Sequence, residues 1–323
     1  MSHIFDALTR AEAEQSGNEL SLTRQLLQMA QSGAPPLIEV AEAAQSGEAP
    51  LAQSLSGILA PGAAELPNPF ESFGSLPIVL PPNSRLVSVT EKDSLAAEKF
   101  RFLAVRLRQL QQTRPLKKLL ITSTMPEEGK STLAANLACT LARRKEKRTL
   151  LLDGDLRRPT VAKQLGLGHV SGLSECLQDD AKLTTSVYRL DALGLWVLPA
   201  GSATQNPLEL MQSGRLLPLI DQLSEWFDWI VIDSPPVLPF GDTIIWARLS
   251  DGILLAARQG KTEKKQLQRG LEALEKTKLL GAIVNSSTNT AHSDYYRRYQ
   301  PPAASRERDK AQGQSKAVKS KLP

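Results

Sequence analysis

A phosphate-binding loop lies between a predicted strand and a predicted helix. The apolar run 118–122 leads into the loop, and residues 133–141 after it repeat apolar side chains at helical spacing. A loop in this position presents backbone N–H groups at a helix N-terminus, where unpaired donors and the helix dipole attract an anion. Lys130 would reach the β- and γ-phosphates of a nucleotide, and the Ser131 hydroxyl would ligate Mg²⁺. Thr124 stands where the consensus has its first glycine, so the loop needs support from elsewhere in the chain.

Three aspartates follow apolar, strand-like runs. Asp153 and Asp155 come at the end of one run, and Asp233 ends another. Ligands of a parallel sheet bind at the carboxyl ends of the strands, so these carboxylates should face the same crevice as the loop. Carboxylate oxygens suit Mg²⁺ that also binds substrate phosphates. Any one aspartate is more commonly an ordinary turn residue, but three of them beside a phosphate loop predict a Mg²⁺–nucleotide site.

Strand-like and helix-like runs alternate along the middle of the chain. The strands are predicted near 117–123, 148–153, 195–200, 228–233, 251–257 and 280–285. The helices are predicted near 94–112, 130–145, 206–225, 241–248 and 262–278. This alternation is typical of an α/β fold with a mostly parallel central sheet and helices on both faces.

The chain divides into four predicted segments. Residues 1–30 carry an amphipathic pattern that favours a docking helix over a merely fraying one. Residues 31–85 have the Pro, Ala, Ser and Gly content of a disordered linker. Residues 86–290 form the P-loop domain, and residues 291–323 hold a tyrosine cluster and a basic, disordered tail.

Composition limits where the protein is expected to act. No apolar run approaches the roughly 18 residues needed to cross a bilayer, and the N-terminus lacks the order of a signal peptide. We therefore expect a cytoplasmic protein that reaches the membrane through a partner. The two cysteines and three histidines lack metal-ligand spacing. The net charge of +5 comes without an aromatic-interleaved basic face, so nucleic acid is not an expected partner.

With these motifs in view, the chain resembles the bacterial tyrosine kinases (BY-kinases) of capsule and exopolysaccharide assembly, in their cytoplasmic CpsD/CapB-like form. These kinases are relatives of the MinD/ParA-type P-loop ATPases. The matching segments are 121–132 for Walker A, 150–159 for the family's Walker A′ and 230–236 for Walker B. Residues 198–201 and 206–210 match the segment between A′ and B. The resemblance is specific, since most P-loop enzymes lack the A′ motif.

The resemblance implies a protein-tyrosine autokinase that uses ATP and Mg²⁺ and regulates capsule or exopolysaccharide synthesis and export. It also implies a homo-oligomer. A membrane-embedded chain-length regulator would activate the kinase and recruit it to the inner face of the plasma membrane.

The resemblance further assigns roles to individual residues. The nucleotide would be held by Glu128, Gly129, Lys130, Ser131 and Thr132, with Asn285 at the adenine. The metal ligands would be Ser131, Asp155 and Asp233. The catalytic residues would be Lys130, Asp155 and Asp153, of which Asp153 takes the proton of the tyrosine hydroxyl.

Three residues outside these sets have weaker assignments. Arg157 and Arg158 would meet phosphate or phosphotyrosine, and a surface ion pair is the alternative for both. Asp242, shortly after Walker B, would orient the metal shell.

Three of the four tyrosines lie together near the C-terminus, at Tyr295, Tyr296 and Tyr299. No apolar periodicity surrounds these rings, so they are not expected in a core. Tyrosines flanked by arginines also suit a binding surface. The resemblance favours the other role, in which the cluster is the target of autophosphorylation.

The chain departs from the family at two positions. Glu127 replaces a glycine of the phosphate loop, and Ala104 replaces the last arginine of a Glu-x-x-Arg-x-x-Arg motif that begins at Glu98. These departures leave open a non-catalytic, ATP-binding regulator of a polysaccharide assembly complex. A MinD/ParA-like ATPase is the other alternative, but it would need a lysine early in the loop, and residues 124–128 have none.

Overall fold

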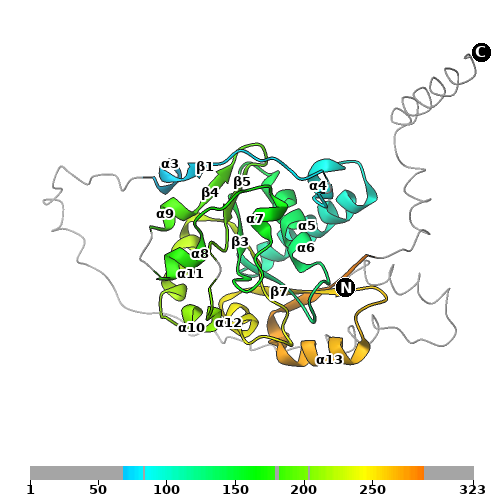
Figure 1. Ribbon diagram of the computed structural model, residues 1–323. Coiled ribbons are helices and arrows are strands. Elements are labelled where there is room, and N and C mark those ends of the chain that lie inside the picture. Colours follow the sequence, from blue (N-terminus) through cyan, green and yellow to red (C-terminus); the bar gives the residue numbers. More distant parts are fainter. Residues whose placement is uncertain (1–67, 83, 179–181, 203, 287–323) are drawn as a thin grey trace, which may run out of the picture.

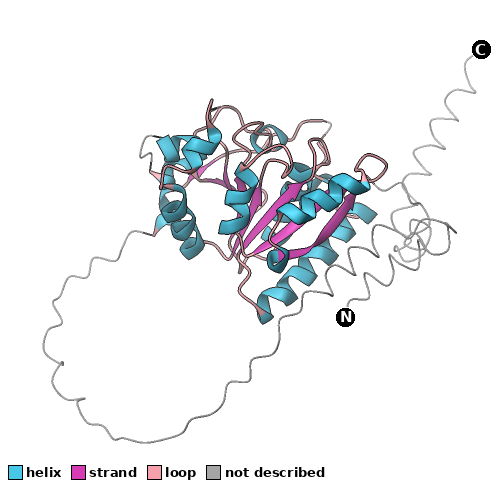
Figure 2. Ribbon diagram, turned by 90° about the horizontal axis from the view of Figure 1, so that it is seen from below, coloured by secondary structure: helices cyan, strands magenta, loops and turns pink. Residues whose placement is uncertain are grey.

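The described chain is built around one eight-stranded sheet (Figure 1). This computed structural model describes residues 68–286 except 83, 179–181 and 203. The predicted docking helix within 1–30 and the predicted tyrosine cluster lie outside the described residues. Helices cover both faces of the sheet (Figure 2), which confirms the predicted α/β class.

The strand order is β1-β4-β5-β3-β6-β2-β7-β8, and β4 with β5 is the one antiparallel pair in the described sheet. The strands are β1 (Gly74–Ser75), β2 (Lys118–Ser123), β3 (Thr149–Asp153), β4 (Tyr188–Leu190), β5 (Leu195–Leu198), β6 (Trp229–Asp233), β7 (Gly252–Arg258) and β8 (Leu279–Asn285). The six predicted strands are all present. The short strands β1 and β4 escape prediction because two or three residues cannot display a period.

The predicted helices are present, but two of them are interrupted. The helix predicted near 262–278 ends at Ala273, because Leu274 is extended, and a short 3₁₀ helix follows. The helices are α3 (Pro69–Ser72), α4 (Val87–Thr90), α5 (Leu95–Thr113), α6 (Lys130–Ala142), α7 (Val161–Gln164), α8 (Leu173–Gln178), α9 (Leu183–Ser186), α10 (Pro207–Met211), α11 (Leu216–Trp226), α12 (Asp242–Leu249) and α13 (Lys264–Ala273), followed by a short 3₁₀ helix (Lys276–Lys278). The single helix predicted over 206–225 is two helices. Gly214, with φ of 82°, adopts the left-handed conformation between them.

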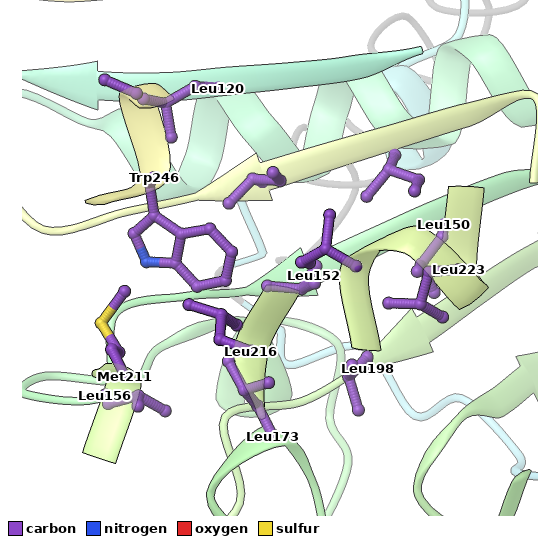
Figure 3. Close-up of a cluster of buried hydrophobic side chains, with 14 of the residues drawn as sticks. Leu120, Leu150, Leu152, Leu156, Leu173, Leu198, Met211, Leu216, Leu223 and Trp246 are labelled. Atoms are coloured by element: carbon purple, nitrogen blue, oxygen red, sulfur yellow. The ribbon is translucent and has the colours of Figure 1, made fainter. Parts of the chain in front are cut away.

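Alternate residues of the central strands pack on opposite faces of the sheet. Leu119 and Leu151 lie in the hydrophobic cluster that includes α6, whereas Leu120 and Leu152 lie in the cluster that includes Trp246 (Figure 3). Full burial of a leucine contributes about 1.5–3 kcal/mol to folding. The two clusters therefore hold the central strands, and the strands fix the positions of the polar residues at their carboxyl ends.

Residues 68–82 belong to the folded domain, so the predicted linker over 31–85 extends too far. Strand β1 pairs in parallel with β4, and Phe73 is buried. The rings of Phe70 and Trp196 lie 5.6 Å apart in an edge-to-face arrangement. Isolated aromatics in a proline-rich stretch carry no local periodicity, and only the tertiary partners show that they are core residues.

Candidate active site

The loop between β2 and α6 has a backbone that requires glycine at one position. Gly129 has φ of 93° and immediately precedes Lys130, the first residue of α6. A Cβ at Gly129 would lie 2.0 Å from the side-chain nitrogen of Asn285. The first turn of α6 offers N–H groups that lack partners within the helix. This geometry supports the prediction that residues 129–132 hold phosphates.

Lys130 connects the loop to the carboxyl ends of β3 and β6. Its Nζ lies 2.7 Å from Asp155 Oδ2 and 3.7 Å from Asp233 Oδ1. The strand register places Asp153 directly opposite Asp233. The structure thus brings together the lysine and the three aspartates that the sequence places in one crevice. Burial would lower the pKa of Lys130, but Asp233 and Asp155 outweigh it and raise the pKa above its ordinary value.

Asp233 is a fully buried carboxylate whose two oxygens accept no hydrogen bond of ordinary geometry within the described chain. Burial raises the pKa of Asp233 to about 6, against the opposing effect of Lys130 and of the Ser131 hydroxyl. Ionising a buried carboxyl without donors is costly unless a cation compensates its charge. An unsatisfied acceptor of this kind, next to a serine hydroxyl, fits a bound Mg²⁺.

The other predicted metal ligands agree with a site that is completed by the nucleotide. In the part of the chain that the structure describes, no three acidic, histidine or cysteine side chains form a preformed metal cage. Mg²⁺ commonly takes one or two carboxylates and obtains its remaining oxygens from water and phosphates. Ser131, Asp155 and Asp233 suit that mode, and their role as ligands stays a prediction.

Asp153 is held in place by backbone donors. Its Oδ2 accepts hydrogen bonds from the N–H groups of Thr160 (3.2 Å) and Val161 (3.0 Å), and its Oδ1 accepts one from Asp155 (3.2 Å). Burial and the neighbouring Asp233 nevertheless raise the pKa of Asp153 to about 8. A carboxyl group with a pKa near neutrality can exchange a proton with a reacting hydroxyl. This property supports the predicted base.

Arg157 and Asp242 form a bidentate ion pair. Arg157 Nε donates to Asp242 Oδ2 at 2.6 Å and Nη2 donates to Oδ1 at 3.0 Å. The guanidinium also lies 4.6 Å from the ring centroid of Phe240. Both oxygens of Asp242 are occupied by Arg157, so the metal-shell role predicted for Asp242 is not supported. The ion pair that the sequence left as an alternative for Arg157 is the one observed.

The two glutamates of the loop differ in their surroundings. Glu127 is exposed and has φ of 67°, the left-handed conformation that explains the glycine of related loops. Glu128 is buried, and its carboxylate accepts hydrogen bonds from residues of the loop itself. The amide of Asn285, predicted at the adenine, donates to the carbonyl oxygen of Glu128 at 3.0 Å. The sequence analysis did not predict that Glu128 and Asn285 stabilise the loop through these hydrogen bonds. The one indication in the sequence is Thr124, which replaces the first consensus glycine and bonds to Glu128.

The burial of Ala104 explains why this chain has alanine where the family motif has arginine. The residue lies on α5 and is fully buried in the cluster that contains α6, so an arginine would not fit there without displacement. Arg101 instead pairs with Glu98 on the surface of α5 at 2.7 Å.

None of the described helices is long and apolar enough to span a membrane.

The fold and site define a P-loop nucleotide-binding domain, and comparison with known proteins specifies its family. Residues 119–301 match the family model of the CobQ/CobB/MinD/ParA nucleotide binding domain. Tyrosine-protein kinase YwqD of Bacillus subtilis is 37% identical over 212 residues, which cover 65% of this chain and 89% of that protein. The kinase domain of the Escherichia coli tyrosine kinase ETK superposes with a TM-score of 0.59 at 25% identity, over 63% of this chain and 82% of that chain. The chain therefore belongs to the bacterial tyrosine kinases, within the MinD/ParA-like nucleotide-binding proteins.

A third relative is longer than this chain. The succinoglycan biosynthesis transport protein ExoP of Rhizobium meliloti is 34% identical over 209 residues, which are 63% of this chain and 26% of that protein. The similarity therefore concerns one part of ExoP.

Proposed function

We propose that this chain is an ATP-dependent protein-tyrosine autokinase that regulates exopolysaccharide or capsule synthesis and export. The observation that carries the proposal is the convergence of Lys130 and three strand-end carboxylates beside the phosphate loop. Membership of the tyrosine kinase family and similarity to part of a succinoglycan transport protein support it. The proposed partner is a membrane-embedded regulator of polysaccharide chain length, which would recruit the kinase to the membrane.

The proposed chemistry is direct phosphoryl transfer, in which the protein supplies position and charge. The amides of residues 129–132 and the ammonium of Lys130 would bind the β- and γ-phosphates. Mg²⁺ held by Ser131, Asp155 and Asp233 would neutralise phosphate charge when bound. Asp153 would accept the proton of the tyrosine hydroxyl as the phenolic oxygen bonds to the γ-phosphorus and the bond to ADP breaks.

A pocket of about 380 Å³ offers a path for the acceptor tyrosine. Arg157, two residues after Asp155, lines the pocket together with Leu208 and polar residues at the start of α10. We place the incoming tyrosine segment here, because the pocket adjoins the segment that follows Asp155.

The direct test is detection of phosphotyrosine after incubation with Mg-ATP, with and without the cytoplasmic tail of a chain-length regulator. A kinase should give phosphotyrosine, and the tail should increase the yield. Nucleotide binding without phosphotyrosine in either condition would support the non-catalytic regulator instead. ATP hydrolysis without phosphotyrosine would support the MinD/ParA-like ATPase.

Asp153→Asn should lower phosphoryl transfer by about 10²–10⁴-fold, because an amide cannot take the tyrosine proton. Binding of Mg-ADP should change little, since the proposed nucleotide contacts lie elsewhere. Single-turnover phosphotyrosine formation and a fluorescent-nucleotide titration on the same sample measure the two effects. Weakened Mg-ADP binding, with transfer restored at saturating Mg-ATP, would show that the roles of Asp153 and Asp233 are reversed.

Changing Tyr295, Tyr296 and Tyr299 together to Phe should remove most autophosphorylation while ATP hydrolysis continues. Each phosphorylated tyrosine would add about −1.5 to −2 charges to a segment rich in Lys and Arg. We propose that the unmodified segment enters the acidic site of a neighbouring protomer and that phosphorylation releases it. Mass spectrometry that places the phosphate mainly on Tyr188 or on serines would exclude this cluster as the substrate.

A further inference from the structure

Glu128 places a buried carboxylate inside the phosphate loop. Its Oε2 accepts hydrogen bonds from the backbone N–H of Thr124 at 2.8 Å and of Met125 at 3.0 Å. The Thr124 hydroxyl lies 2.9 Å from Oε1, and the Thr262 hydroxyl also donates to Oε1. The side chain is only 3% exposed. All of these donors belong to protein, so the carboxylate is satisfied without a ligand.

These contacts connect the loop to two other segments of the sheet edge. Thr262, in the connection between β7 and α13, accepts a hydrogen bond from the N–H of Arg258 at 2.7 Å. The Arg258 guanidinium donates to the carbonyl oxygen of Glu127 at 3.3 Å. At the end of β8, Asn285 donates to the carbonyl oxygen of Glu128. The phosphate loop is thus held from both β7 and β8.

The loop of this chain has particular need of such support. Glu127 adopts a left-handed conformation that L side chains disfavour. Thr124 occupies the position of a consensus glycine, and its methyl group packs against α13, where a Cβ at Gly270 would lie 2.6 Å away. A carboxylate in an anion-binding loop would repel phosphate unless donors compensated its charge, and four donors do so here.

We propose that Glu128 is a positioning residue that holds the phosphate loop in its binding conformation from the inside. The side chain acts through the backbone of residues 124–129 and does not contact the nucleotide. Thr124 and Thr262 are its partners, so the glycine-to-threonine departure at 124 and the glutamate at 128 form one unit. This inference rests on the nucleotide binding that the proposed function includes.

Titration of the full chain with a fluorescent ADP in the presence of Mg²⁺ tests the proposal. Glu128→Ala should raise the dissociation constant by about tenfold or more, because the loop N–H groups lose their acceptor. Glu128→Gln should recover most of the affinity, since its amide oxygen can still accept from Thr124 and Met125. Glu127→Ala is the matched control, an equal truncation of an exposed neighbour, and should not weaken binding.

Three outcomes separate the possibilities. If the unmodified chain does not bind nucleotide, the proposed function fails. If it binds and the folded Glu128→Ala protein binds equally well, the positioning role of Glu128 is overturned. The same conclusion follows if Glu127→Ala weakens binding as much as Glu128→Ala. Should Glu128→Ala fail to fold, Thr262→Val is the second variant, which removes the donor to Glu128 together with the acceptor of the Arg258 N–H. It should raise the dissociation constant by about threefold, and an unchanged value would overturn the proposal.

Discussion

Lys130→Met should reduce phosphotyrosine formation by about 10²-fold or more, the scale of losing one preorganised charge at a transition state. Lys130 is the one cation that the structure places between Asp155 and Asp233, within the described residues. Its ammonium would move onto the phosphates during transfer, and methionine keeps the length of the side chain without the charge. Phosphotyrosine immunodetection and a fluorescent-ADP titration measure the loss of transfer and of binding.

The same substitution should leave the domain folded but less stable near neutral pH. Removing Lys130 deprives two buried carboxylates of their compensating charge, and their protonation at lower pH should restore part of the lost stability. Lys264→Met, at an exposed position at the start of α13, is the control and should retain activity. Unchanged phosphotyrosine yield in Lys130→Met would contradict the kinase proposal.

Asp233→Asn should weaken Mg²⁺-dependent ATP binding by at least about tenfold, the lower range for disturbing a metal site. In EDTA the same variant should melt several degrees higher than the parent, since roughly 1 kcal/mol shifts Tm by about 2–4 °C in a domain of this size. The parent must bury a carboxylate without hydrogen bonds, and asparagine removes its charge. Function and stability should therefore change in opposite directions.

The pH dependence of this effect follows from the raised pKa of Asp233. The folded state holds the proton up to a pKa of about 6, against an ordinary value of 3.8, so the unfolded chain releases it first. The stability that Asp233 contributes is therefore present below about pH 4 and is lost as the pH rises to about 6. The Tm advantage of Asp233→Asn should grow across that interval.

Asp228 precedes β6, at the opposite end of the strand from Asp233. Its substitution is a control whose expected effect on Tm has the opposite sign. Burial would raise the pKa of Asp228, but hydrogen bonds from the Arg148 backbone and Lys147 lower it. Asp228→Asn should thus lower Tm at neutral pH and leave Mg²⁺-dependent binding unchanged. Equal effects of the two substitutions on nucleotide binding would remove the metal role from Asp233.

The predictions that the structure confirms rest on local patterns. The six predicted strands and the meeting of Lys130 with three aspartates follow from apolar runs of strand length and from the rule that the carboxyl ends of parallel strands lie at one side of the sheet. The predicted linker boundary was wrong because the burial of Phe73 and the packing of Phe70 against the core depend on aromatic residues that are distant in the sequence. The ion pair of Asp242 could not be predicted, because its partner, Arg157, lies 85 residues away.

By itself the sequence determined the phosphate loop and the acidic strand ends, since each is a motif of about ten consecutive residues. It also determined the α/β class, since strand-like and helix-like runs alternate along the chain. The tertiary structure alone decided how the side chains are shared among partners. From the sequence, Glu128 is predicted to contact the nucleotide because it precedes Gly129. In the structure its carboxylate accepts a hydrogen bond from Thr262, 134 residues away. A buried carboxylate takes whichever donors the packed sheet edge brings within hydrogen-bond distance, and that distance exists only after the strands have assembled.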